Sequence, residues 1–251
     1  MFSNRHKIAL SALIAATPIA AAPSLAQDSS TRVSWAPSYG GVCEDCDLRG
    51  RNLSGWDISN AHYPRADLTG ALLRATRAIN VDFSSAIAER TDFRKAVLDG
   101  SIFVDAKLGK ARFDDASLLN SNLSGAVLTG AKLRDARLNG ATIRRADFMS
   151  VFAARADFSG SNVSRTLFDG SDLTGAQFNN AVVIGASFRR ARMDQAGFAN
   201  VRLLEVDLTG ATGLATADFD GACAGPLSKL PDGLELDSCL PLEGAMIVDL
   251  Q

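Results

Sequence analysis

The chain has 251 residues and is close to charge-balanced, with 26 Lys and Arg against 28 Asp and Glu. Histidine is scarce, since only His6 and His62 occur, and this scarcity excludes most catalytic triads. The charges are unevenly spread along the chain. Residues 46–210 hold 22 basic and 18 acidic residues, a net of +4, whereas residues 212–251 hold seven acids and Lys229, a net of −6. The acidity therefore lies in the tail and not in the long body.

The first 26 residues predict a secretory signal peptide. A basic start, Arg5-His6-Lys7, precedes an apolar stretch from Ile8 to Ala22, and Ser24-Leu25-Ala26 supplies small residues where a signal peptidase reads. We expect cleavage near Ala26-Gln27. An uncleaved anchor is the weaker interpretation, because spanning a bilayer takes roughly 20 apolar residues. No later segment approaches that length, so we expect a mature chain without a transmembrane segment, in the periplasm or secreted.

A five-residue rule governs residues 46–210. Of the 33 positions whose number ends in 3 or 8, 30 carry Leu, Phe, Ile, Val, Met or Tyr, and the exceptions are Ala78, Ala88 and Ala153. Two residues earlier, 31 of 33 positions carry Ala, Ser, Thr, Val or Cys, and only Arg51 and Trp56 differ. A period of five fits neither a helix nor a simple strand, so the chain must turn once per unit. Gly, Asn and charged residues at numbers ending in 0 or 5 are expected to supply these turns.

A period held this long predicts a solenoid of stacked short strands, because each unit can bury its apolar residue only against copies of itself. Quintets such as Ala66-Asp67-Leu68-Thr69-Gly70 resemble those of the pentapeptide-repeat family, and the resemblance covers 165 of the 251 residues. It implies an all-β fold, a right-handed quadrilateral parallel β-helix with one quintet per side and about eight coils. With twenty residues per coil, Phe148, Phe168 and Phe188 should stack in one column. Phe158, Phe178 and Phe198 should stack in the next.

The departures from the rule lie at the two ends, where solenoids need caps. We expect residues 27–45 to cap the first coil, residues 46–221 to form the β-helix, and residues 222–251 to form a clamped C-terminal cap and tail. After Ala211 the register slips by one, since Ala217 and Phe219 take the small and large roles.

Four cysteines, Cys43, Cys46, Cys223 and Cys239, lie at the ends of the repeat. In an oxidising compartment they are expected to act as end clamps. The simplest pairing joins Cys43 to Cys46 and Cys223 to Cys239, and two other pairings stay open. The Cys43–Cys46 spacing also suits a redox or metal-binding pair. A structural zinc needs a second pair nearby, and a thioredoxin-like role needs a βαβ context. We therefore expect no metal and no cofactor, and keep the redox or metal protein as a second alternative.

The best interface candidates are outward-facing apolar residues. Val182, Ile184 and Leu204 share a face near the C-terminal end, with Ile102 and Val104 further down it. A row of exposed β-branched residues indicates that this face is covered, either by the tail of the chain or by a second molecule. The family resemblance implies a homodimer through the C-terminal end as one form of that cover.

A basic stripe is the other surface feature. Arg74, Arg94 and Arg134 share one column of the repeat, which suggests a site for an anionic partner. Asp residues such as Asp92 and Asp135 occupy the same face, so we expect the charge to be neutralised within it, and nucleic acid is a disfavoured partner.

The repeat leaves little room for chemistry. An interior filled by Leu and Phe has no cavity, and no nucleophile–base pair is recognisable. We therefore expect a non-enzymatic exported scaffold that binds an unknown macromolecular partner, in the first place a protein, through its flat faces. The resemblance implies one alternative, a gyrase- or topoisomerase-binding protein that imitates duplex DNA. The signal peptide and the net charge of +4 on the body both oppose it.

Overall fold

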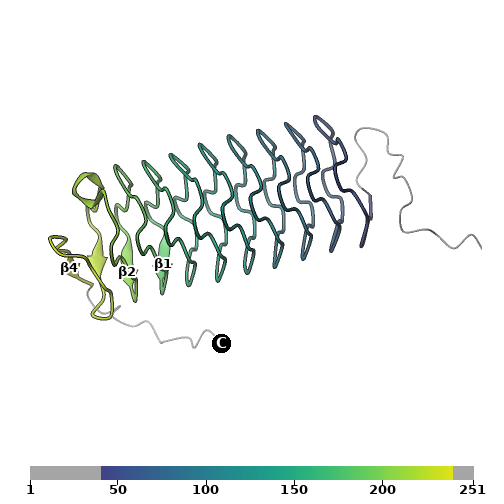
Figure 1. Ribbon diagram of the computed structural model, residues 1–251. Coiled ribbons are helices and arrows are strands. Elements are labelled where there is room, and N and C mark those ends of the chain that lie inside the picture. The colour runs from purple at the N-terminus through teal and green to yellow at the C-terminus, as the bar shows by residue number, and fades with distance from the viewer. Residues whose placement is uncertain (1–40, 240–251) are drawn as a thin grey trace, which may run out of the picture.

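A computed structural model describes residues 41–239 of the chain. The expected signal peptide, residues 27–40 of the expected N-terminal cap, and residues 240–251 lie outside this range. The described chain winds into a stack of similar coils along one long axis, with its N-terminal and C-terminal ends at opposite ends of the stack (Figure 1). The fold is a parallel β-helix.

Pairing between coils follows a twenty-residue period. Parallel bridges join Val42 to His62, His62 to Asp82 and Asp82 to Ile102, and the same step recurs along the other three quintets of the period. Backbone hydrogen bonds accompany the bridges, such as that from the Leu68 N–H to the Ile87 carbonyl at 2.7 Å. Each quintet therefore lies above the quintet four units earlier, which accounts for twenty residues per turn of the solenoid.

The regular elements are short. β1 (Val182–Ile184), β2 (Arg202–Leu204), β3 (Cys223–Ala224) and β4 (Asp237–Ser238) form one parallel sheet in the order β1-β2-β3-β4, and a 3₁₀ turn, η1, spans Leu214–Thr216. Elsewhere a strand is reduced to a single bridge, because the chain turns every five residues. Within residues 41–239 there is no α-helix, and no helix long and apolar enough to cross a membrane.

The turns place the fifth residue of a quintet in the left-handed region. Gly70 has φ 67°, and residues with a Cβ adopt similar values, including Arg65 at 58° and Ala75 at 52°. This conformation costs a residue with a Cβ roughly 1–2 kcal/mol. Hydrogen bonds between coils offset that cost, for example from the Ala75 N–H to the Arg94 carbonyl at 2.9 Å. The turn positions thus tolerate Ala and Ser as well as the expected Gly, Asn and charged residues.

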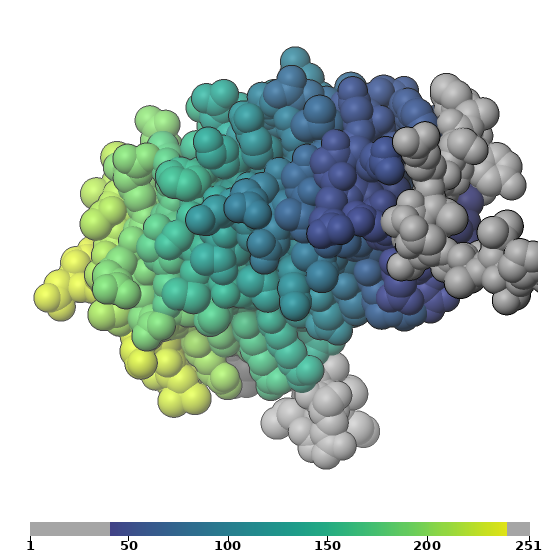
Figure 2. All heavy atoms as spheres, turned by 45° about the vertical axis from the view of Figure 1, so that its right-hand side comes forward, coloured from purple at the N-terminus to yellow at the C-terminus, as the bar shows by residue number. Residues whose placement is uncertain are grey.

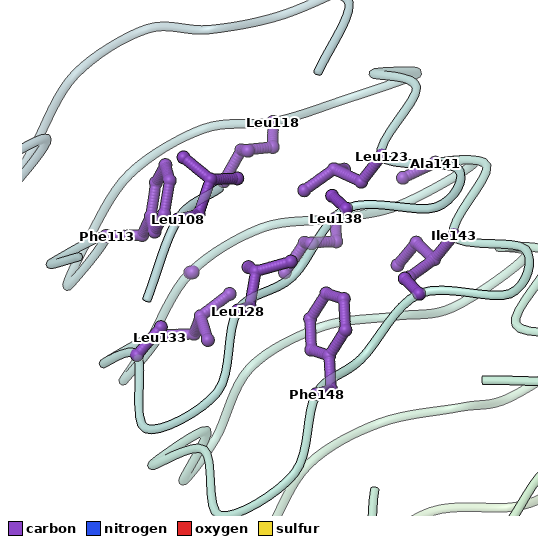
Figure 3. Packing of buried hydrophobic residues seen from close by; sticks show 14 of the residues in the cluster. Leu108, Phe113, Leu118, Leu123, Leu128, Leu133, Leu138, Ala141, Ile143 and Phe148 are labelled. Atoms are coloured by element: carbon purple, nitrogen blue, oxygen red, sulfur yellow. The ribbon is translucent and has the colours of Figure 1, made fainter. Parts of the chain in front are cut away.

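The inward positions fill the interior with columns of side chains. Residues at numbers ending in 3 or 8 are buried from Leu48 to Leu208, and Figure 3 shows Leu, Ile and Phe side chains of successive coils meeting in the middle of the body. The predicted aromatic columns are present. Phe158 and Phe178 stack at 4.8 Å and Phe168 and Phe188 at 5.1 Å, while Phe148 is tilted against Phe168 at 5.3 Å.

A second aromatic cluster lies nearer the N-terminus and was not anticipated. Phe83 stacks on Phe103 at 5.0 Å, and Phe93 stacks on Phe113 at 4.8 Å. These two columns meet edge to face, as between Phe83 and Phe93 at 6.2 Å. Both clusters combine offset stacking along a column with edge-to-face contact across columns, the two arrangements that aromatic rings favour.

Recurrent polar side chains cap the turns on the outside. The Asp67 carboxylate accepts a hydrogen bond from the Thr69 N–H at 2.9 Å, and Asp157 accepts one from the Ser159 N–H at 2.9 Å. The same contact, two residues on, recurs in other quintets, and it is the Asx-turn contact that stabilises a tight turn. The regular Asp residues of the repeat are therefore turn-capping groups.

At both ends the observed coils differ from the boundaries expected for the β-helix. At the N-terminal end Val42 already pairs with His62 and Cys43 is buried, so the coil geometry begins one quintet before the expected boundary at residue 46. At the other end the predicted register slip is present. Gly197 bridges to Asp218, twenty-one residues on, and Phe198 stacks on Phe219 at 5.4 Å. The 3₁₀ turn η1 accommodates the extra residue.

The segment after residue 221 continues the stack. β3 and β4 add two further parallel strands beyond β2, so the segment expected to cap the last coil also extends the sheet.

Truncating one buried ring should destabilise the protein far more than truncating an exposed one. We expect Phe178→Ala to cost about 3–5 kcal/mol, because it opens a cavity between two stacked rings. Phe152→Ala should change stability by less than about 0.5 kcal/mol, since that ring is 54% exposed. Thermal unfolding followed by circular dichroism compares the two variants. Equal losses would contradict the packing of the columns described above.

Candidate interaction surfaces

The outer surface divides into walls, each made of every fourth quintet. The Val182 wall comprises residues 41–45 and the quintets twenty residues apart up to 201–205. The Phe152 wall comprises residues 51–55 and the quintets twenty residues apart up to 191–195. Figure 2 shows the outer surface as a continuous envelope of side chains from the N-terminal to the C-terminal end of the body. Since the interior is filled, binding sites on the described body are expected on its outer surface.

The structure separates the five predicted interface residues into two groups. Val182, Ile184 and Leu204 lie together on β1 and β2, because Val182 pairs with Arg202 and Ile184 with Leu204. Val182 is 45% exposed and Ile184 36%, whereas Leu204 is half-buried. A hollow of about 260 Å³ lies over them, lined by Ala181, Val182, Val183, Ile184, Asn200, Arg202 and Leu204.

Ile102 and Val104 do not join this surface. Ile102 is on the same wall but four coils away, and the bridge column between it and Val182 passes through Asn122, Thr142 and Asn162. The intervening polar side chains break the apolar row, so these two residues are not part of a continuous apolar face.

The Phe152 wall has a feature that the sequence analysis missed. Phe152 is 54% exposed and pairs across coils with Lys132 on one side and Asp172 on the other. A hollow of about 370 Å³ lies here, lined by Arg112, Asp114, Lys132, Arg134, Phe152, Ala154 and Asp172. An aromatic side chain at an outward position, directly before the unusually small inward Ala153, is the sequence signal that could have found it.

Ion pairs neutralise most of the basic stripe on this wall, as predicted. Asp92 holds both Arg74 at 2.5 Å and Arg94 at 2.6 Å. Asp135 holds Arg155 at 2.7 Å and lies 3.7 Å from Arg134. The stripe is therefore a mixed-charge surface.

Lys132 is the coil neighbour of Phe152 on the N-terminal side. It has no ion pair within residues 41–239, although it lines the hollow beside Phe152. Asp172, on the other side of the ring, is held by Arg192 at 2.5 Å. The ring thus lies between one unpaired cation and one tightly held carboxylate.

The Asp172 carboxylate has a perturbed pKa. Partial burial by itself would raise it, but hydrogen bonds from Arg192 and from the Thr174 hydroxyl and N–H bring the pKa of Asp172 below its ordinary value. At neutral pH the carboxylate is charged and fixed in place, so the rim of the hollow is preorganised.

The N-terminal end carries the Cys43–Cys46 disulfide, and the other end carries Cys223–Cys239. Cys43 is buried in the first described quintet, and no helix begins at this pair. No group of three or more His, Cys, Asp or Glu side chains suited to a metal occurs in the part of the chain that the structure describes.

Beside the disulfide, Arg65 binds Glu44 and Asp45. The Arg49 guanidinium and N–H lower the pKa of Asp47 to about 2.

Sequence models of pentapeptide repeats match much of the repeat region. A sequence model of pentapeptide repeats with 8 copies matches residues 79–115 and 111–148, and a second one with 9 copies matches residues 164–212. No curated protein matches the sequence.

Among solved structures, the chain is similar to HetL, a pentapeptide repeat protein involved in heterocyst differentiation regulation from the cyanobacterium Nostoc sp. strain PCC 7120. The two are 24% identical over 79% of this chain and 93% of HetL, with a TM-score of 0.40. It is also similar to a trypsin-treated form of QnrB1, a plasmid-mediated fluoroquinolone resistance protein, at 22% identity over 70% of this chain and 91% of that one, with a TM-score of 0.39. A pentapeptide repeat protein of the Arabidopsis thaliana thylakoid lumen is 30% identical over 53% of this chain and 69% of that one, with a TM-score of 0.18.

The Asp172 contacts generate a pH-dependent prediction. A carboxylate whose pKa is lower in the folded than in the unfolded chain contributes stability above the unfolded value, about 3.9, and loses it as the pH falls through the folded value. We expect Asp172→Asn to lower stability at pH 7 by about 0.5–1 kcal/mol. The difference from the wild type should close as the pH falls from 5 toward 2.

Glu89→Gln is the matched control, because Glu89 is exposed and forms no ion pair with another described residue. Thermal midpoints of the three proteins across this pH range provide the measurement. A difference for Asp172→Asn that persists unchanged at pH 2 would contradict the assignment.

Proposed function

Because the chain belongs to the pentapeptide-repeat family, we propose that it is an exported, non-enzymatic protein that binds another protein through the Phe152 wall. The proposal includes the finer geometry that the family resemblance implies, a right-handed β-helix of about eight coils. The observation that carries the proposal is the exposed Phe152 ring in a hollow bordered by Lys132 and Arg134.

The filled interior directs binding to the outside. Inward side chains from Leu48 to Leu208 are buried against one another. Enzymes and small-molecule receptors use concave pockets with a few convergent polar groups. A rigid rod with a close-packed interior offers walls instead, and walls suit the broad contact of a protein partner.

The Phe152 wall has the composition of an interface centre. Aromatic and Arg side chains carry much of the binding energy at protein interfaces, and they do so near the centre of the contact. Phe152 offers an apolar ring of which about half is exposed, and Arg134 lies beside it in the same hollow. Ion pairs such as Arg192–Asp172 hold the rim in one arrangement, which reduces the ordering cost of binding.

The charge on this wall indicates the kind of partner. Opposite charges alternate across it, as in Arg74–Asp92–Arg94 and Arg134–Asp135–Arg155. Such a surface is complementary to a protein that presents both signs around an apolar centre. It does not suit duplex nucleic acid, and it does not imitate it, since the body carries a net charge of +4.

Two features support export. The N-terminal 26 residues have the layout of a cleaved signal peptide. Both cysteine pairs are joined as disulfides, which form and persist in oxidising compartments such as the periplasm. Paired in this way, the cysteines of the Cys43–Cys46 motif have no free thiolate to offer a metal.

Partner capture tests the wall. In cells that express a tagged full-length copy, we expect proximity labelling to mark at least one envelope or secreted protein reproducibly. Phe152→Ala should reduce that labelling at least tenfold, because the variant removes the apolar centre of the contact. Leu167→Ala is the matched control, since Leu167 is an exposed apolar residue on a different wall, and it should leave labelling unchanged.

Equal labelling by wild type and Phe152→Ala would refute the Phe152 wall as the interface. Labelling of a cytoplasmic topoisomerase in place of an envelope protein would favour the DNA-imitating alternative and overturn the proposal.

Export has its own test. We expect the mature protein from the envelope or medium to begin at Gln27 and to have no thiol that reacts with a maleimide before reduction and four that react after it. Mass spectrometry measures both the N-terminus and the number of labelled cysteines. A chain retained in the cytoplasm with Met1 and four reactive thiols would overturn export while leaving the wall assignment open to the capture experiment.

A further inference from the structure

We propose that residues 240–251 of this chain cover the apolar hollow over β1 and β2, with Met246, Ile247 and Val248 packed against Val182, Ile184 and Leu204. This inference concerns the Val182 wall and is independent of the function proposed for the Phe152 wall. Four observations support it, namely the hollow, the path of the chain, the length of the segment and its charge.

Covering the apolar side chains of the hollow would lower the free energy of the folded protein. Val182 and Ile184 are exposed at alternate positions of β1, on either side of the buried Val183, and Leu204 lies beside Ile184 on β2. Together with Ala181 and Val183 they make the lining of the hollow mainly apolar. Burying such side chains is worth roughly 25 cal/mol per Å² of apolar surface removed from water.

The chain leaves the described body from the same sheet that carries this hollow. β4 (Asp237–Ser238) is the last strand of the sheet β1-β2-β3-β4, and the Cys239 N–H donates a hydrogen bond to the Ala224 carbonyl of β3 at 3.0 Å. The Cys223–Cys239 disulfide ties the same point to β3 covalently. The start of the segment is therefore fixed on the wall that contains the hollow.

The segment is long enough to return over β2 and β1. Neighbouring strands lie about 4.8 Å apart, so β1 is about 14 Å from β4 across the sheet. Twelve residues, 240–251, reach up to about 40 Å when extended. The apolar run Met246–Val248 begins seven residues after Cys239, and roughly 23 Å of chain covers the distance to the hollow with slack for a turn at Pro241.

Charge complements the apolar contact. The segment carries Glu243 and Asp249 and no basic side chain, so the apolar run has an acid on each side. The hollow has Arg202 in its lining. Arg165 lies at the adjoining corner, where a Cβ on Gly185 would be 3.3 Å from the Arg165 Cγ. The Arg165 cation thus borders the place that we assign to the two carboxylates, where opposite charges attract one another.

A thiol at position 182 reports the cover directly. Val182→Cys is made in the full mature chain and in the same chain carrying Met246→Ser, Ile247→Ser and Val248→Ser, which keeps the length and both disulfides. We expect a maleimide to label the thiol at least tenfold faster in the triple-Ser background, because the polar segment no longer packs on the hollow. Phe152→Cys in both backgrounds is the control, and its labelling rate should be equal in the two.

Light scattering and dilution distinguish this segment from a second copy of the chain. The proposal is supported if the protein is a monomer, if its labelling rate does not depend on protein concentration, and if the rates in the two backgrounds differ at least tenfold. Equal rates in the two backgrounds overturn it. A dimer whose labelling rate rises on dilution also overturns it, because a second molecule would then be the cover.

Discussion

Hydrogen bonding between coils twenty residues apart is the constraint on which the rest of this structure depends. Each quintet must place its N–H and carbonyl groups directly above those of the quintet four units earlier, as Val42, His62, Asp82 and Ile102 do. Because the step never changes between residues 42 and 212, inward side chains are forced into straight columns. Those columns leave room only for a small residue at one inward position and a large one two residues later, which is the five-residue rule of the sequence.

The same constraint explains the aromatic clusters and the turns. Coils stacked at β-sheet spacing bring most successive Phe rings of one column to 4.8–5.1 Å, which suits offset stacking. The fifth residue of each quintet is held in the left-handed region whether or not it is Gly, as Arg65 and Ala75 illustrate. Local backbone strain is accepted because the coil above and the coil below both supply hydrogen bonds.

The filled interior of the rod leaves its outer surface available for contacts with other molecules. The repeat specifies what points inward and leaves the outward positions free to vary, so the walls differ in character along the same body. One wall carries an exposed ring among ion pairs, and another carries an apolar hollow over β1 and β2. The two are physically distinct, because the first is bordered by fixed charges on the body and the second is lined mainly by apolar side chains of β1 and β2.

The sequence by itself determined the inward half of this protein. The columns of Phe148 and Phe158, the slip to Ala217 and Phe219, and the family could all be inferred, because burial in a solenoid depends only on position within the repeat. The tertiary structure alone decided three other things: the early start of the coils at Val42, the isolation of Ile102 from Val182, and the hollow around Phe152. These depend on the lateral neighbours of outward side chains and on how each Arg reaches its carboxylate. A five-residue period constrains neither the lateral neighbours nor the ion pairs, because almost any side chain can occupy a solvent-exposed position on a wall.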